Sequence, residues 1–235
     1  MKLYHGTSER VARLALQHGL QPRSESGVES QWDDHPSSPD HVYLTAAYAA
    51  YFAMQATEKG ERWAIIEIDT ELLPSGLFPD EDWLEQVSRS QDLPEEWGIN
   101  GASMEDRTKW FREHLWMFPH MWKDSINGLG NCTHEGVIPP EAITRVSFIE
   151  PARNPSMTLM AIDPTITLLN YAICQSKYQN MIKWCMGDEV DTSAFLGFPA
   201  GVMFPEGMRQ MFQQQEQQLR QVLSNRTGVT VRSCQ

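Results

Sequence analysis

Residues 2–8, KLYHGTS, place a histidine and a glycine between a short apolar run and two hydroxyl side chains. Leu3-Tyr4-His5 predicts a short strand. Thr7 or Ser8 can then cap a helix, because a side-chain oxygen accepts a hydrogen bond from the unpaired N–H groups of a first turn. Gly19 is expected to end this helix, because glycine commonly follows the last helical residue. The expected inward face of the helix consists of Val11, Leu14, Ala15 and His18, which follow helical spacing.

Four further stretches predict strands. WAIIEID (63–69) is the clearest, because it is β-branched and apolar and ends in polar residues. The others are HVYLT (41–45), CTHEGV (132–137) and ITRVSFI (143–149), with an Ala-rich helix expected over residues 46–58. Strands and helices mixed in this way predict an α+β core over residues 1–150.

Two polar or aromatic stretches interrupt this core. Residues 23–40 are rich in Ser, Asp and Pro and predict a surface loop. Residues 70–128 predict loops and short amphipathic helices, and PDEDWLEQ (79–86) is interpreted as a helix start with acids near its positive end. The density of aromatic residues between Trp83 and Trp122 predicts core positions for them.

The character of the chain changes after Pro151. Residues 166–186 predict an apolar helix, and residues 206–225 predict an amphipathic, Gln-rich one. We therefore expect residues 151–235 to form a helical C-terminal extension.

Composition narrows the function classes. The net charge is −12, and residues 151–235 contribute about +1 of it, so the first 150 residues are strongly acidic. A uniformly basic groove is absent, which counts against tight nonspecific nucleic-acid binding and fits a basic protein partner equally well. The sequence lacks an apolar run of about 18 residues and the layout of a signal peptide, so we expect a soluble, cytoplasmic protein without a membrane partner. The four cysteines form no C-x-x-C pair, and we expect neither disulfides nor a metal site.

Three segments form an ordered set: Tyr4-His5-Gly6-Thr7, residues 42–45 with the Ala-rich helix, and GVIPPEAITRV (136–146). This set resembles the ADP-ribosyltransferase superfamily, in particular its histidine–tyrosine–glutamate branch and bacterial toxins that modify nucleic acids. Residues 65–86 are also similar to a stretch of bacterial transferases of this type, including phage-defence enzymes that act on RNA. The resemblance covers about residues 1–150 and implies a split antiparallel β-sandwich with NAD as co-substrate.

The resemblance assigns NAD binding to Tyr4, His5, Gly6 and Thr7. His5 would hydrogen-bond the nicotinamide-side ribose, and the Gly6 backbone would engage the carboxamide. A neutral imidazole both donates and accepts hydrogen bonds, and a residue without Cβ lets the backbone approach a planar ligand. The alternative is that Gly6 only makes a turn and that His5 is a half-buried filler.

The resemblance assigns nicotinamide stacking to Tyr43, whose ring offers a flat apolar wall. Tyr51 or Phe52 could cover the other face of the nicotinamide. For these two residues the competing interpretation is a core position, since aromatic residues at helical spacing usually face the core.

The catalytic carboxylate is where the sequence departs from the family pattern. The spacing to GVIPP places Asn131 where the family has a glutamate, and Glu135 is the nearest carboxylate. On a strand these two residues and Thr133 share one face, while Cys132 and His134 point to the other. Glu135 could supply the charge, or it could be a solvent-facing residue before a turn. If Asn131 occupies the catalytic position, the reaction relies on another carboxylate or is lost.

The sequence thus predicts a mono-ADP-ribosyltransferase, a bacterial toxin or phage-defence effector. RNA is favoured over DNA as its target, and a protein target stays open. A local basic face for nucleic acid could come from Lys177, Lys183, Arg209 and Arg220. The family implies an antitoxin partner. Two alternatives remain: a catalytically silent binding module, and an RNA 2′-phosphotransferase, which relies on arginines where this chain has Tyr43 and Glu135 or Asn131.

Overall fold

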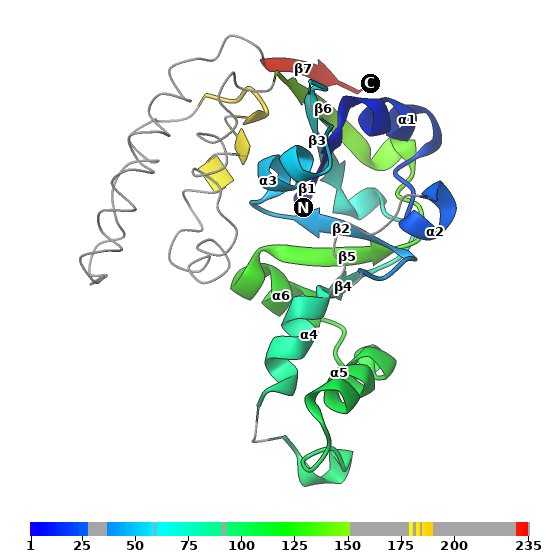
Figure 1. The fold of residues 1–235 in the computed structure, drawn as a ribbon, viewed down its shortest axis with the longest axis vertical. Helices are drawn as coiled ribbons and strands as arrows, with labels where there is room; N and C mark the ends of the chain where they lie inside the picture. The colour runs from blue at the N-terminus through cyan, green and yellow to red at the C-terminus, as the bar shows by residue number, and fades with distance from the viewer. Residues whose placement is uncertain are drawn as a thin grey trace, which may run out of the picture.

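The computed structural model describes residues 1–27, 37–58, 60–90, 93–150, 179–180, 182–183, 185–189 and 229–234. The fold is mixed α+β and is built on one seven-stranded antiparallel sheet in the order β4-β5-β2-β1-β3-β6-β7 (Figure 1). The strands are β1 (Lys2–Ser8), β2 (His41–Thr45), β3 (Trp63–Asp69), β4 (Leu77–Pro79), β5 (Asn131–Glu135), β6 (Ile143–Ile149) and β7 (Val229–Ser233).

The strands expected at 41–45, 63–69 and 143–149 are confirmed with the same bounds. The strand expected at 132–137 begins one residue earlier and ends at Glu135, and the one expected at 3–5 extends over seven residues. Neither β4 nor β7 was expected.

Six α-helices and four short 3₁₀ segments lie among the described residues. The α-helices are α1 (Glu9–His18), α2 (Arg23–Ser26), α3 (Ala49–Gln55), α4 (Glu81–Ser88), α5 (Met104–Glu113) and α6 (Met121–Leu129). The 3₁₀ segments are η1 (Thr70–Leu72), η2 (Glu95–Trp97), η3 (Leu115–Met117) and η4 (Pro140–Ala142). Helix α2 lies in a stretch that was expected to be a loop.

Helix α1 begins and ends where the sequence predicts. The Ser8 hydroxyl accepts a hydrogen bond from the Val11 N–H, and Gly19 adopts a φ of 85°, which favours glycine. The predicted inward face is partly wrong: Ala12 and Ala15 are buried, whereas Leu14 is 49% exposed. The direction from which the sheet approaches selects the buried stripe, and the sequence spacing alone does not reveal that direction.

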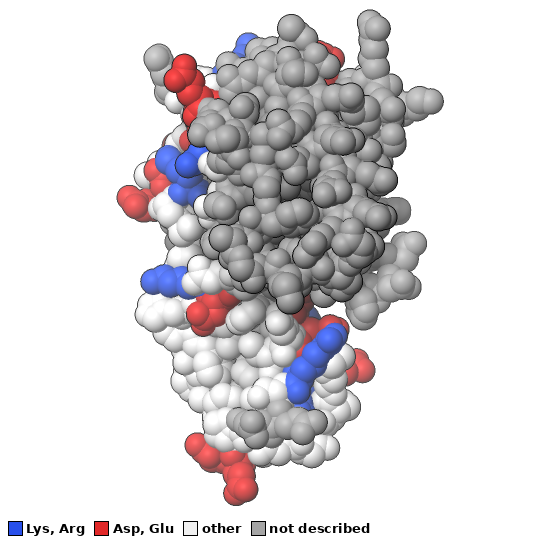
Figure 2. All heavy atoms as spheres, turned by 90° about the vertical axis from the view of Figure 1, so that its left-hand side faces the viewer, with Lys and Arg blue, Asp and Glu red and all other residues white. Residues whose placement is uncertain are grey.

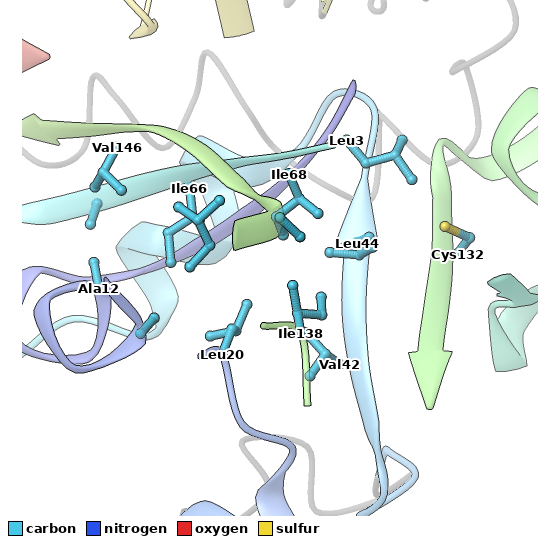
Figure 3. Packing of buried hydrophobic residues seen from close by; sticks show 14 of the residues in the cluster. Leu3, Ala12, Leu20, Val42, Leu44, Ile66, Ile68, Cys132, Ile138 and Val146 are labelled. Carbon is cyan, nitrogen blue, oxygen red and sulfur yellow. The ribbon is translucent and has the colours of Figure 1, made fainter. Parts of the chain in front are cut away.

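The two faces of the sheet carry separate hydrophobic clusters. Leu3, Leu44 and Ile66 belong to the cluster on the α1 side (Figure 3). The cluster on the α3 side includes Tyr51, Ile65, Ile182, Cys185 and Met186. Strand β3 therefore buries both of its faces, as strands in the middle of a covered sheet do.

A helical lobe follows β4 and precedes β5. It consists of α4, η2, α5, η3 and α6 and extends from the β4 edge of the sheet (Figure 1). Its own cluster centres on Leu84 and Phe111, and Trp110 packs against them. The expected core position is wrong for Trp116, which is 76% exposed. Figure 2 shows that the lower part of the molecule is largely uncharged on one side, with acidic side chains at its end.

The C-terminal part of the chain returns to the sheet. Strand β7 pairs with β6 along residues 145–149, so residues 229–233 differ from the helical extension expected for 151–235. Ile182 and Met186 are buried against the α3 side of the sheet. The helix expected at 206–225 lies outside the described residues, as do most positions of the one expected at 166–186.

No helix in the described part of the chain combines the length and the apolar composition that a membrane span requires.

Candidate functional site

The predicted site residues His5, Tyr43 and Asn131 lie on three neighbouring strands of the sheet. Strand β2 lies between β1 and β5, and its register pairs Thr45 with Asn131 and Tyr43 with Thr133. Strands β1 and β2 pair at one position only, Tyr4 with Thr45, whereas β1 pairs with β3 along its whole length. The sheet therefore opens between β1 and β2 beside His5.

His5 spans this opening. Its Nδ1 atom lies 2.9 Å from the backbone carbonyl oxygen of Tyr43. A carbonyl oxygen only accepts hydrogen bonds, so Nδ1 carries the proton and Nε2 is the acceptor of the neutral ring. Burial lowers the pKa of His5, and the hydrogen bond to Tyr43 opposes this shift. The structure thus holds a neutral imidazole in one tautomer.

Gly6 packs directly against the backbone of α3. A Cβ atom at this position would be 1.8 Å from the carbonyl oxygen of Ala49 and 2.5 Å from the amide nitrogen of Ala53. The close approach of the helix backbone therefore requires glycine here without any ligand. The neighbouring Thr7 is buried, with 4% of its surface exposed.

The hydroxyl of Tyr43 is held by two partners from different parts of the chain. It donates a hydrogen bond to Glu81 and accepts one from the amide of Ser38 at 2.7 Å. The same Ser38 amide lies 3.0 Å from the other carboxylate oxygen of Glu81. Burial and the neighbouring Glu81 raise the pKa of Tyr43, so the phenol stays protonated and acts as a donor.

Sequence reasoning missed Glu81. Residues 79–86 were interpreted as a helix start with acids, and that is confirmed: Asp80 caps α4, and Glu81 lies in its first turn. The contact with Tyr43 joins residues that are 38 positions apart, and no local pattern reveals it.

Asn131 is buried, with 6% of its surface exposed, and its Oδ1 atom has no hydrogen-bond partner within the described ranges. Its backbone oxygen accepts a hydrogen bond from the Ser125 hydroxyl at 2.8 Å. That hydroxyl also accepts one from the Asp80 amide at 3.0 Å. Ser125 therefore ties the start of β5 to the start of α4.

Asp80 has a structural task. Its carboxylate oxygen accepts a hydrogen bond from the Asp82 amide at 3.0 Å, which caps α4. Burial, together with the nearby charge of Asp82, raises the pKa of Asp80 to about 7.

Glu135 lies at the other end of β5 and is exposed. It lies four positions after Asn131, which corresponds to about 13 Å along a strand. Its register partner His41 lies 2.9 Å from the Thr133 hydroxyl through Nδ1. Glu135 is therefore remote from the position that the family pattern assigns to the carboxylate.

The remaining predicted aromatic residues differ in burial. Tyr51 is a core residue with 6% exposure, and its ring meets the half-buried Phe52 edge-on at 5.5 Å. Tyr4 packs against the same cluster as Tyr51, and burial, with a contribution from Glu67, raises the pKa of Tyr4 to about 12.

The potential cation ligands are dispersed. Among the residues that the structure describes, no three or more His, Cys, Asp or Glu side chains are grouped so that they could hold a metal ion. Lys183 is the one member of the predicted basic face that lies within the described ranges.

A scan of this chain against models of protein families, a search of curated proteins and a search of solved structures each found no match.

Proposed function

We propose that this protein is an NAD-dependent mono-ADP-ribosyltransferase with a split antiparallel β-sandwich that takes NAD in its cleft. The adjacency of β1, β2 and β5 carries the proposal. These strands hold His5, Tyr43 and Asn131, the positions to which the family resemblance assigns NAD binding and the catalytic carboxylate. The opening of the sheet between β1 and β2 supports the split architecture.

The state of His5 supports a role in ribose binding. With Nδ1–H fixed on the Tyr43 carbonyl, Nε2 is left to accept a hydrogen bond from a ribose hydroxyl. The Tyr43 ring is half-buried and its hydroxyl is held at both sides, so the ring presents a fixed flat surface. Stacking on such a ring contributes about 0.5–1.5 kcal/mol beyond burial.

The proposed reaction breaks the bond between nicotinamide and ribose and joins the ribose C1 to a nucleophile of the target. We favour RNA over DNA or protein as the target, because the resembling toxins modify nucleic acids. A cytoplasmic enzyme of this kind would act as a toxin or phage-defence effector, restrained by an antitoxin protein.

The test uses NAD labelled in its adenosine half, incubated with total RNA, DNA or cell lysate. Transfer of label to RNA by the parent protein, lost in His5→Ala and retained in His18→Ala, supports the proposal. His18 is a matched control because it is an exposed histidine at the end of α1. Absence of transfer to all three targets would overturn it.

Two observations favour a second candidate, a catalytically silent binding module on the same fold. An amide occupies position 131, and the backbone of α3 covers Gly6. This candidate predicts that NAD or a related nucleotide binds in a calorimeter without any nicotinamide release. It also predicts that Glu135→Ala changes neither quantity.

A further inference from the structure

The position that the family pattern gives to a carboxylate holds an amide, and the structure brings other acids close to it. The hydroxyl of Ser125 hydrogen-bonds both the Asn131 carbonyl and the Asp80 amide. The start of α4 and the start of β5 are therefore bridged by a single side chain. The β4–β5 register pairs Pro79 with Cys132, which places Asp80 beside Asn131.

We propose that Glu81 supplies the carboxylate that the transfer reaction needs, in place of the residue at position 131. The proposal rests on the proposed function. Glu81 contacts the hydroxyl of Tyr43, the residue whose ring is proposed to stack on nicotinamide. Its carboxylate therefore lies at the edge of that ring.

The two nearby acids do not fit this role. The carboxylate of Asp80 is buried and caps the N–H of Asp82, so it is committed to helix α4. Glu135 is exposed and lies four residues along β5 from Asn131. Glu81 is half-buried and held by two donors, the Tyr43 hydroxyl and the Ser38 amide, which fix its direction.

Asn131 provides an independent sign of a polar ligand. Its Oδ1 atom is buried without a partner in the described part of the chain, and a buried acceptor left unpaired is costly. Asn131 shares its face of β5 with Thr133, the register partner of Tyr43. A ribose hydroxyl that donates to this oxygen would satisfy it when NAD is bound.

The proposed transfer step consists of one bond broken and one bond formed at the ribose C1. The C1–N1 glycosidic bond breaks, and its electron pair leaves with nicotinamide, which becomes neutral. The ribose carries the developing positive charge, and the Glu81 carboxylate stabilises it. The acceptor oxygen or nitrogen then bonds to C1, and its proton passes to Glu81. Water can serve as the acceptor, so the step can be measured without knowing the target.

The experiment compares the parent protein with Glu81→Gln and the matched control Glu85→Gln, a glutamate one turn further along α4 that pairs with Arg89. Single-turnover release of nicotinamide from NAD labelled in that ring gives the rate, and calorimetry gives the NAD affinity. We expect Glu81→Gln to slow release at least about 100-fold, as removal of one charge-stabilising group does. Its NAD affinity should stay within about threefold, since the group acts in the transition state. Glu85→Gln should release nicotinamide at the parent rate.

Glu81 could instead act indirectly, by positioning Tyr43. The variant Tyr43→Phe and the double variant Tyr43→Phe with Glu81→Gln distinguish this role from direct action on the substrate. If Glu81→Gln slows release further by the same factor in the Tyr43→Phe background, Glu81 acts on the substrate. If Tyr43→Phe alone matches Glu81→Gln and the double variant is no slower, the assignment is overturned. Full activity of Glu81→Gln overturns it while leaving the proposed function standing. A parent protein that neither binds NAD nor releases nicotinamide overturns both.

Discussion

The Nδ1–H of His5 donates a hydrogen bond of 2.9 Å to the backbone carbonyl of Tyr43. This bond connects the strands β1 and β2 where their ladder opens, and it leaves Nε2 as the acceptor nitrogen of the ring. An asparagine in place of His5 can present its amide N–H near the position of Nδ1, but it has no atom at the position of Nε2. The structural role of His5 and its proposed ligand-binding role can therefore be separated by substitution.

We predict that His5→Asn folds with a free energy of unfolding within about 1 kcal/mol of the parent. His5→Ala should lose about 1–3 kcal/mol, because it leaves the Tyr43 carbonyl unpaired. Both variants should lose ADP-ribose transfer by at least about tenfold, which corresponds to one missing hydrogen bond of about 1.4 kcal/mol. Urea denaturation and the transfer assay give the two quantities. Equal stability loss in both variants would contradict the separation.

The pH dependence of stability is predicted to follow three histidines. Burial lowers the pKa of His5, His41 and His134. The unfolded chain therefore binds protons more readily than the folded protein, so these contributions are present above the unfolded pKa of about 6.5 and are lost as the pH falls below it. We expect the free energy of unfolding to fall between pH 7 and 5, by up to about 1.4 kcal/mol per pH unit for each histidine.

A urea-denaturation series over this pH range measures that slope. The fully buried His134 supplies the decisive variant. His134→Asn should make the slope shallower, whatever it does to stability at pH 7. The exposed His120 is the control, and His120→Asn should leave the slope unchanged. The same slope in the parent and in His134→Asn would show that this histidine does not contribute.

Asp80 is predicted to act in the opposite direction. Its pKa in the folded protein is raised to about 7 by burial and by Asp82. The folded state then holds the proton more firmly than the unfolded chain, so this contribution is present below about pH 4 and is lost as the pH rises through 7. Asp80→Asn keeps the capping oxygen and removes the charge. Its stability relative to the parent should therefore rise from pH 4 to 7 by about 1 kcal/mol or more.

Chemical denaturation of Asp80→Asn at pH 4, 6 and 8 tests this sign. The matched control is Asp124→Asn, because Asp124 is exposed on α6. Its stability relative to the parent should not change with pH. A constant difference between Asp80→Asn and the parent across the range would mean that Asp80 stays ionised.

The sequence predicted the strands that carry continuous apolar or β-branched residues, such as residues 63–69. It did not predict β4 or β7. Strand β4 is three residues long and ends in proline, and β7 exists because it pairs with β6, about 80 residues earlier in the chain. Such edge strands depend on a partner that no local window contains.

The same limit applies to the candidate site. His5 and Tyr43 lie on the strands that the sequence predicted at residues 3–5 and 41–45. The sequence motifs did not reveal the partner of the Tyr43 hydroxyl. Glu81 reaches it because α4 begins directly after β4, and β4 lies next to β5, the neighbour of β2. For Gly6, the sequence interpretations were a ligand contact or a turn, and the structure adds a third cause, the backbone of α3.

We predict that Gly6→Ala destabilises the protein severely. The new Cβ would overlap the backbone of Ala49 and Ala53, and a helix backbone cannot move aside as a flexible side chain can. Overpacking of this kind costs about 1–3 kcal/mol or more. Gly76→Ala is the control, because a Cβ there meets nothing within 4 Å. It should change the free energy of unfolding by less than about 1 kcal/mol, and equal losses in the two variants would contradict the packing argument.

Arg145 joins the sheet to the C-terminal segment. Its guanidinium bonds Glu67 of β3 at 2.6 Å and Asp188 at 2.8 Å. Glu67 is 5% exposed, so removal of Arg145 leaves a buried carboxylate without its counter-charge. Breaking a buried pair in this way costs about 3–5 kcal/mol. We therefore expect Arg145→Met to lower the free energy of unfolding by several kcal/mol.

The double variant Arg145→Met with Glu67→Gln separates the two ends of this link. If the buried charge causes the loss, the second substitution should recover most of it, because the neutral amide still accepts the hydrogen bond of 2.6 Å from Thr144. Asp188→Asn should cost less than about 1 kcal/mol, since its side chain is 40% exposed and solvent screens the pair. A large loss in Asp188→Asn and no recovery in the double variant would instead mean that the pair between Arg145 and Asp188 provides most of the stabilisation. Urea denaturation of the four proteins decides between these outcomes.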